Sequence, residues 1–328
     1  MNTSTMLNKH FVLFFVLLGL LSCKDEAPAE EALETINLSL ELERFDQIMY
    51  GASPKDIPII RKKYPEFFVN EVPDSIYAQK ITDSIYHELY LEVQNKFPNL
   101  QSYTAEIEDV LKRSKFYFPQ FKTPSRLISL ISEMDYQNKV IYTDSLLIVS
   151  LDLYLGENHR YYVGEFYDYQ RKLFEPSQIL PDVADALVRK LVPRNKESIF
   201  VEQIVAEGKI QYIKQQLLPN TDEHLIVGYS KEQQNWCLAN EMYMWQYFVD
   251  TKLLFETGQK NHQRFIAPAP FSKFYLEIDS QSPGRVGVWL GLQIVKSYMD
   301  KNKVSLDELL KLEPKLIYEN AKYKPKKS

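Results

Sequence analysis

The sequence predicts an α+β protein with a helical N-terminal part, a central antiparallel or mixed sheet, and a mostly helical C-terminal half. Runs rich in β-branched residues, separated by polar residues, crowd between residues 119 and 154. Apolar residues at helical spacing, bounded by prolines or capping side chains, fill most of the chain on both sides of that region. A length of 328 residues allows two domains or one large one, and we expect one globular domain over residues 36–328.

The N-terminal part is predicted to begin with a strand and to continue with helices. Between Ile36 and Leu42, apolar residues alternate with polar ones, which is the period of a half-buried strand. Asp74 can cap a helix that Pro98 stops. The buried stripe of that helix would consist of Ile81, Ile85, Leu89, Val93 and Phe97. A second helix is expected from Ala105 to about Lys115.

Local patterns also place the strands of the sheet and the C-terminal helices. Strands are expected at residues 126–131, 139–142 and 146–153. Helices are expected at residues 181–192, 198–218, 230–248 and 285–299, and a further helix is expected to start near Ser305. Ser230 and Gln233 have the spacing of a capping box at the start of the third helix. Apolar groups surround most of that helix, so we expect it to be buried in the core.

The N-terminus has the features of a lipoprotein signal peptide. Lys9 and His10 precede an apolar run from Phe11 to Leu21, whose length suits the hydrophobic segment of a signal peptide. Leu20-Leu21-Ser22-Cys23 resembles a bacterial lipobox. We therefore expect cleavage between Ser22 and Cys23, removal of residues 1–22, and diacylation of Cys23. The alternative is an ordinary signal peptide with a buried cysteine.

An acidic segment follows the expected anchor. Residues 25–34 contain five acids and no base, which favours an extended tether over residues 23–35. We expect a lipid-anchored protein of the cell envelope, at the outer membrane facing the periplasm rather than at the inner membrane or the cell surface, although the composition leaves the leaflet open. The bilayer is then a partner through acylated Cys23.

Composition and cysteine usage narrow the functional classes. A net charge of −5 without clustered Lys and Arg argues against nucleic acid as a partner. An apolar fraction of 45% fits a folded globular protein. Cys23 and Cys237 are the only cysteines, so lipidation of the first leaves no internal disulfide. Cys237 lies in an apolar run and is predicted to be an inert buried thiol.

The sequence contains no motif of a common catalytic or metal site. It lacks H-E-x-x-H, G-x-S-x-G, a Walker loop and G-x-G-x-x-G. His87, His224 and His262 occur singly in polar surroundings, so we expect them to be solvated. We predict no catalytic residue, no metal ligand, and no cofactor other than the covalent lipid on Cys23.

Three segments are candidates for a binding cleft. Glu157, Asn158 and His159 follow a predicted strand and offer several hydrogen-bonding groups, although an ordinary turn is the favoured interpretation of them. Glu207 precedes Gly208 inside a helical pattern, where the glycine favours close helix packing over a functional role for Glu207. Glu241 interrupts an apolar helix, and a buried carboxylate needs a partner, so a structural ion pair is favoured over a catalytic base.

Several longer segments resemble the gliding-motility lipoprotein family GldB of Bacteroidetes. They are residues 43–46 (ERFD), 134–142 (MDYQNKVIY), 154–159 (YLGENH), 228–230 (GYS), 240–241 (NE), 269–274 (APFSKF) and 282–285 (SPGR). The resemblance implies an envelope lipoprotein that gliding requires and that is linked to type IX secretion. It implies no reaction. We expect a non-catalytic component that binds other envelope proteins of gliding and secretion.

A fainter resemblance in layout concerns the zinc peptidases of the gluzincin type. Their second helix supplies a glutamate ligand about nineteen residues after H-E-x-x-H. Glu207 would take that place, and counting back leads to residues 184–188, where Asp185 alone could bind a metal. The resemblance implies a degenerate scaffold without zinc. The alternative function is a degenerate or atypical peptidase or cell-wall hydrolase that uses Glu207, Glu241 and His159.

Overall fold

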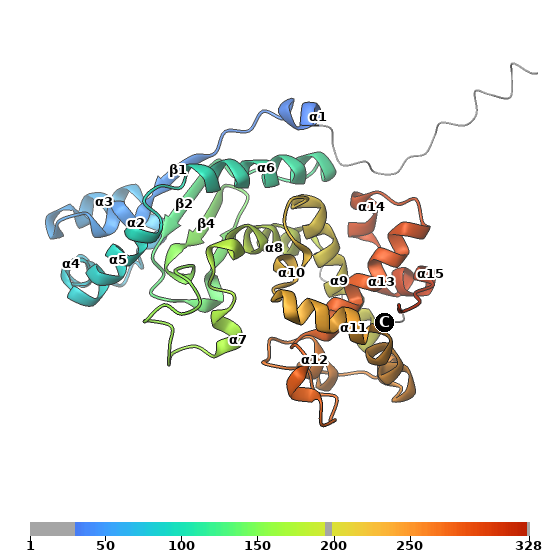
Figure 1. Cartoon of the computed structure of the whole chain (residues 1–328). Coiled ribbons are helices and arrows are strands. Elements are labelled where there is room, and N and C mark those ends of the chain that lie inside the picture. The colour runs from blue at the N-terminus through green and yellow to red at the C-terminus, as the bar shows by residue number, and fades with distance from the viewer. Residues whose placement is uncertain (1–29, 194–198, 327–328) are drawn as a thin grey trace, which may run out of the picture.

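The computed structural model describes residues 30–193 and 199–326, and its architecture is α+β, as predicted (Figure 1). The helices are α1 Glu30–Glu34, α2 Phe45–Tyr50, α3 Ile57–Lys63, α4 Asp74–Thr82, α5 Ser84–Lys96, α6 Gln101–Tyr117, α7 Asp168–Arg171, α8 Ile179–Leu191, α9 Phe200–Leu217, α10 Glu223–Val227, α11 Lys231–Asp250, α12 Lys260–Phe265, α13 Val286–Lys301, α14 Leu306–Lys311 and α15 Pro314–Ala321. The strands are β1 Glu41–Arg44, β2 Arg126–Leu130, β3 Val140–Tyr142 and β4 Leu146–Ser150. The expected cleavage and lipidation residues, Ser22 and Cys23, lie outside the described residues.

The four strands form one mixed sheet in the order β1-β2-β4-β3. β1, β2 and β4 run parallel, and β3 pairs antiparallel with β4. The predicted strand at residues 36–42 begins later than expected, at Glu41, which pairs with Arg126. Because β2 itself begins at Arg126, the residues before Glu41 have no neighbouring strand to bond.

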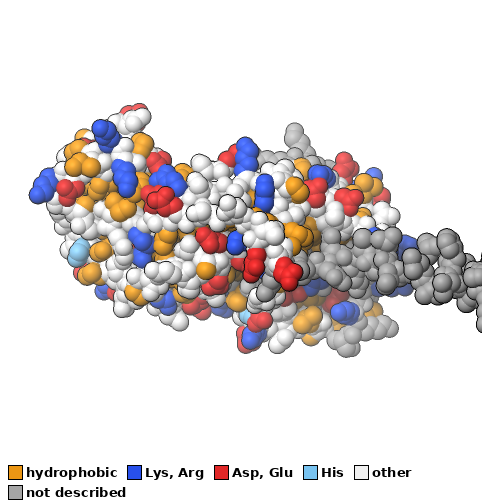
Figure 2. All heavy atoms as spheres, turned by 90° about the horizontal axis from the view of Figure 1, so that it is seen from above, with side chains coloured by type: hydrophobic (Ala, Val, Ile, Leu, Met, Phe, Trp, Pro, Cys, Tyr) orange, Lys and Arg blue, Asp and Glu red, His pale blue; other side chains and the backbone are white. Residues whose placement is uncertain are grey.

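The sheet lies between two helical layers (Figure 1). Side chains of α6 and α8 pack against Leu127 and Val149 on one face. The helices α2 to α5 lie on the other side, and the C-terminal helices form a separate group beyond α8. Acidic and basic side chains are interspersed on the face seen in Figure 2, and apolar side chains gather over the N-terminal helices at its left.

Two expectations for the N-terminal part are wrong. The single helix predicted from Asp74 to Phe97 is two helices, because Asp83 leaves helical geometry and its carboxylate accepts the Ile85 amide at 2.8 Å, capping α5. Ile85 is consequently 66% exposed instead of buried. The end of the expected tether is also structured, since residues 30–34 form α1 and Leu33 is buried.

The central helices of the C-terminal half are α9 and α13, not α11 as predicted. The capping box of Ser230 and Gln233 is present, but only four residues of α11 are buried. They are Cys237, Glu241, Met244 and Phe248. Burial raises the pKa of the Cys237 thiol well above its ordinary value, consistent with an inert cysteine. None of the helices in the described residues is long and apolar enough to span a bilayer.

Glycines allow α9 and α13 to cross in backbone contact. A Cβ atom built on Gly208 would lie 2.1 Å from the Gly291 carbonyl carbon, and one on Gly291 would lie 1.7 Å from the Ile204 carbonyl oxygen. Neither position has room for a side chain. This confirms close helix packing as the role of Gly208.

Candidate functional site

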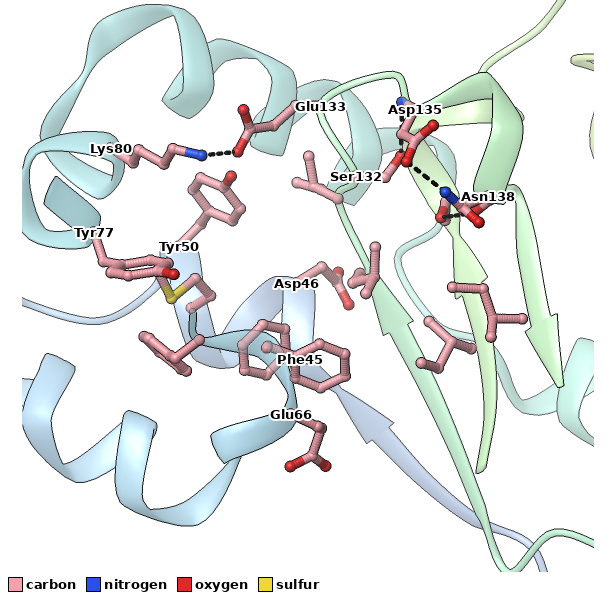
Figure 3. Close-up of a pocket in the computed structure, with 18 residues that line it drawn as sticks. Phe45, Asp46, Tyr50, Glu66, Tyr77, Lys80, Ser132, Glu133, Asp135 and Asn138 are labelled. Atoms are coloured by element: carbon pink, nitrogen blue, oxygen red, sulfur yellow. Dashed lines mark hydrogen bonds and ion pairs between the residues drawn. The ribbon is translucent and has the colours of Figure 1, made fainter. Parts of the chain in front are cut away.

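A large cavity lies between the sheet and the N-terminal helices. It has a volume of about 490 Å³. Ile141 of β3, Ile148 of β4 and Leu130 of β2 supply its sheet wall. Opposite them lie aromatic side chains that include Tyr50 of α2 and Tyr77 of α4 (Figure 3). We call this space the sheet-face cavity; its wall is mostly apolar, which suits the burial of an apolar group.

A buried carboxylate forms one corner of the sheet-face cavity. Asp46 follows β1 and is fully buried. Its two oxygens accept from the Arg44 guanidinium at 2.7–3.2 Å, from the Ser129 hydroxyl at 2.6 Å and from the Gln94 amide at 2.8 Å. The charge is therefore compensated within the protein. This network joins β1 and β2 to α5 and fixes the corner of the cavity.

The loop after β2 forms the rim and contains strained backbone. Glu133 and Met134 have φ angles of 60° and 63°, a left-handed conformation that is uncommon for residues other than glycine. The Glu133 carboxylate binds the Lys80 ammonium group from α4, and it accepts from the Tyr86 hydroxyl at 3.1 Å (Figure 3). The loop is thereby tied to the helices across the cavity mouth. Such strain persists only where surrounding contacts hold it, and it clusters at functional sites.

Asp152, which follows β4, holds this loop from below. Its fully buried carboxylate accepts from the Ser132 amide at 2.9 Å and from the Met134 amide at 2.7 Å. Burial raises the pKa of Asp152 to about 6, and the hydrogen bonds from Ser132 and Met134 only partly oppose this. The Asp152 carboxyl group therefore fixes the position of the rim loop.

The raised pKa of Asp152 predicts a pH dependence of stability. The unfolded carboxyl has a pKa of about 3.9, so the folded state binds the proton more tightly and this contribution to stability is lost as pH rises from about 4 to about 6. A difference of about two pKa units corresponds to about 3 kcal/mol. Denaturant unfolding of the wild type and of Asp152→Asn at pH 4, 5, 6 and 7 measures it. The stability of the wild type should fall relative to the variant across this range; a constant difference would contradict the assignment.

The predicted cleft residues lie at separate places. Glu157, Asn158 and His159 follow one another in the loop after β4, where the His159 imidazole lies 3.7 Å from the Glu92 carboxylate of α5. Burial lowers the pKa of His159, which favours the neutral ring at pH 7. The buried Glu241 carboxylate of α11 accepts from the Tyr323 hydroxyl at 2.7 Å. Its partner is thus a phenol instead of the expected ion pair.

Glu207 lines a second cavity of about 310 Å³, which neither His159 nor Glu241 lines. Its carboxylate accepts two hydrogen bonds from the Arg189 guanidinium, at 2.8 and 3.0 Å. Burial would raise the pKa of Glu207, but the Arg189 contact outweighs it and the net shift is downward. A carboxylate held in this way is a weak base, so the grouping of Glu207, Glu241 and His159 expected for a hydrolase is not found in the structure.

The surroundings of Asp185 do not fit a metal ion. Asp185 accepts from Arg189 at 2.6 Å and from the Lys214 ammonium group at 3.1 Å. Fixed side-chain cations thus lie where a metal would have to bind both Asp185 and Glu207. No group of three or more His, Cys, Asp or Glu residues within the described ranges could hold a metal ion.

The sheet-face cavity was not predicted, although the sequence contains a clue to it. Asp46 and Ser132 each lie two residues after the end of a strand, β1 and β2, and the carboxyl ends of neighbouring parallel strands meet at one edge of a sheet. That clue requires a parallel pairing, which local patterns do not specify. His262, expected to be solvated, was missed as well: its Nδ1 atom is buried in the wall of the second cavity without a hydrogen bond.

Comparison with known proteins identifies the family. A family described as gliding motility protein GldB matches residues 26–325, nearly the whole chain. No significant match was found among curated proteins or among solved structures. The resemblance to zinc peptidases therefore stays a prediction. Because the family match includes the sheet, both cavities and all the helices described above, the chain belongs to the GldB family of gliding-motility lipoproteins.

Proposed function

We propose that this protein is a non-catalytic, membrane-anchored part of the gliding machinery and that it holds a segment of another envelope protein in the sheet-face cavity. The family supports a role in gliding. The observation that carries the proposed binding role is the cavity itself, which offers about 490 Å³ of largely apolar space. Volumes of this size are typical of binding sites.

The charges of the cavity indicate the kind of segment. Asp46, Glu66, Glu133 and Asp135 line it, and the first three are paired with Arg44, Arg126 and Lys80. Asp135 is exposed and accepts only from neighbouring amide groups. We therefore propose an apolar or aromatic side chain inside the cavity and a lysine or arginine of the partner beside Asp135. The family assignment favours partners from gliding and type IX secretion.

Photo-crosslinking in intact gliding cells tests this function. A photoreactive residue at Tyr77, inside the cavity, should give a reproducible crosslinked partner. The same photoreactive group placed at Tyr167, which is 71% exposed and does not line the cavity, should give no such crosslink. Ile141→Asp should abolish the crosslink from position 77 because a carboxylate would enter the apolar wall. Ile59→Asp, on an exposed part of α3, should leave it intact. A crosslink unaffected by Ile141→Asp, or none at all, would refute the proposed site.

The anchor is the second part of the proposed function. Two acyl chains on Cys23 would hold the protein stably, whereas a single chain binds reversibly. Cys23→Ala should therefore move the protein from the membrane fraction to the soluble fraction. We propose that the anchor lies in the outer membrane and faces the periplasm, and protease protection in intact cells distinguishes this from surface exposure. A Cys23→Ala protein that stays fully in the membrane fraction would exclude the lipid anchor.

A further inference from the structure

The second cavity contains a cationic side chain without an ion-pair partner among the described residues. Most charges that line this cavity are paired: Lys139 binds Asp182, and Asp185 and Glu207 share Arg189. Arg285 differs. Its guanidinium donates from Nη1 to the Val227 carbonyl at 3.0 Å, and its charge acts on the Glu207 carboxylate without a direct contact. A guanidinium has five N–H donors, so this half-buried one keeps donors for a ligand in the cavity that it lines.

The backbone around Arg285 fixes its position. Arg285 has a φ angle of 62°, a strained conformation that persists only where surrounding contacts hold it. Those contacts are present: the Tyr229 hydroxyl donates to the Gly284 carbonyl at 2.7 Å, and the Val286 amide donates to the Ser272 hydroxyl at 3.2 Å. A Cβ atom on Gly284 would lie 2.1 Å from the Ala269 carbonyl oxygen. The strained loop therefore holds the guanidinium at the cavity wall.

The other polar residue of this wall that lacks a partner does not offer it to the cavity. His262 of α12 lines the space, but its Nδ1 atom, which has no hydrogen-bond partner in the described structure, is buried behind the wall. Arg285 is therefore the residue that can donate several hydrogen bonds to a ligand here.

The charge and shape of the space select a class of ligand. Four cations, Lys139, Arg189, Lys214 and Arg285, line it against three carboxylates, Asp182, Asp185 and Glu207, which leaves an excess of one positive charge. The remaining wall is largely aliphatic, and it includes Leu173, Ile226 and Ile266. A single negative charge on a short apolar group would fit both properties.

We infer that the second cavity binds the carboxylate of a small aliphatic acid or of a peptide C-terminus with an aliphatic last residue. The guanidinium of Arg285 binds the carboxylate, and the aliphatic wall receives the side chain. Carboxylate and guanidinium form paired, charge-assisted hydrogen bonds, which are about twice as strong as neutral ones. This site is separate from the sheet-face cavity and does not depend on its proposed function.

Isothermal titration of the full-length lipidated protein in detergent tests the inference. N-acetyl-leucine should bind at one site at least about tenfold more tightly than N-acetyl-leucinamide, which has the same shape without the charge. Inorganic phosphate should bind more weakly than N-acetyl-leucine. 4-Methylpentanoate distinguishes the two sources of the carboxylate. If it binds as tightly as N-acetyl-leucine, the ligand is a free aliphatic acid; if it binds more weakly, the ligand is a peptide C-terminus.

Variants connect the binding to the named residues. Arg285→Gln should weaken binding of N-acetyl-leucine at least about tenfold. Arg160→Gln, on a surface arginine with 57% exposure, should not change it. Leu173→Asp, at a half-buried residue of the aliphatic wall, gives a second reading if Arg285→Gln does not fold, and it should also weaken binding because a carboxylate would repel the ligand. Three results with the wild type would overturn the inference: no binding of N-acetyl-leucine, equal affinity for N-acetyl-leucine and its amide, or equal affinity for N-acetyl-leucine and phosphate. Binding of N-acetyl-leucine that is unchanged in both cavity variants would overturn it as well.

Discussion

Gly291→Ala is expected to destabilise the protein by at least about 3 kcal/mol. In an ordinary helix this substitution is favourable by about 1 kcal/mol, because alanine has the higher helix propensity. Here the new Cβ atom would lie 1.7 Å from the Ile204 carbonyl oxygen. Backbone atoms of α9 cannot rotate away as a side chain could, so the two central helices would have to separate and lose packing along their length.

Denaturant unfolding measures this cost, and a second glycine provides the control. Gly258 has a φ angle of 93° and no atom within 4 Å of a built Cβ. Gly258→Ala should therefore cost only the backbone strain, about 1–2 kcal/mol. Gly208→Ala should resemble Gly291→Ala, since its Cβ meets the same crossing from the other helix. A Gly291→Ala protein as stable as the wild type would show that the helices do not cross in backbone contact.

Asp46→Ala is the second substitution with a large expected effect, about 3–5 kcal/mol of lost stability. The fully buried carboxylate compensates the Arg44 guanidinium, whose side chain is 12% exposed. Removing one partner of a buried ion pair leaves the other charge buried and uncompensated. The Ser129 hydroxyl and the Gln94 amide would also lose their acceptor.

The matched control for Asp46→Ala is Asp144→Ala. Asp144 binds Lys122 at 2.7 Å, and the two side chains are 56% and 69% exposed. Ion pairs between such exposed side chains contribute little to stability. Thermal or denaturant unfolding of both variants gives the comparison. If the two substitutions cost the same, the network around Asp46 does not hold β1 and β2 to α5.

Local signals in the sequence predicted most elements of the fold but not their burial. Strands β2 to β4, the capping box of Ser230 and the helix start at Ser305 follow from alternation and from side chains that bond nearby amides. The orientation of α11 does not. Its aromatic residues suggested a core helix, yet Tyr243 is 66% exposed. Aromatic side chains with a polar end are stable at a surface, so their number does not tell which helix is central.

The sites depend on contacts that span long stretches of sequence. Lys80 and Glu133 meet across the mouth of the sheet-face cavity, fifty-three residues apart. Arg285 and His262 approach the second cavity from different segments. Sequence analysis selected Glu157, Asn158 and His159 because they are polar neighbours in one short loop. A cavity, in contrast, forms where two packed layers leave a gap. The pairing of the strands determines where that gap lies.

The position of the sheet-face cavity between two layers has a consequence for the free protein. Its apolar floor belongs to the sheet, and its opposite wall belongs to α2 and α4. The Asp46 network and the ion pair of Lys80 with Glu133 link the two layers at the edges of the cavity, and between these links the cavity separates the walls. Segments with few buried contacts have the lowest local unfolding free energy. A bound partner would supply apolar contacts across the cavity. The local unfolding free energy of the N-terminal layer would therefore be highest when a partner is bound.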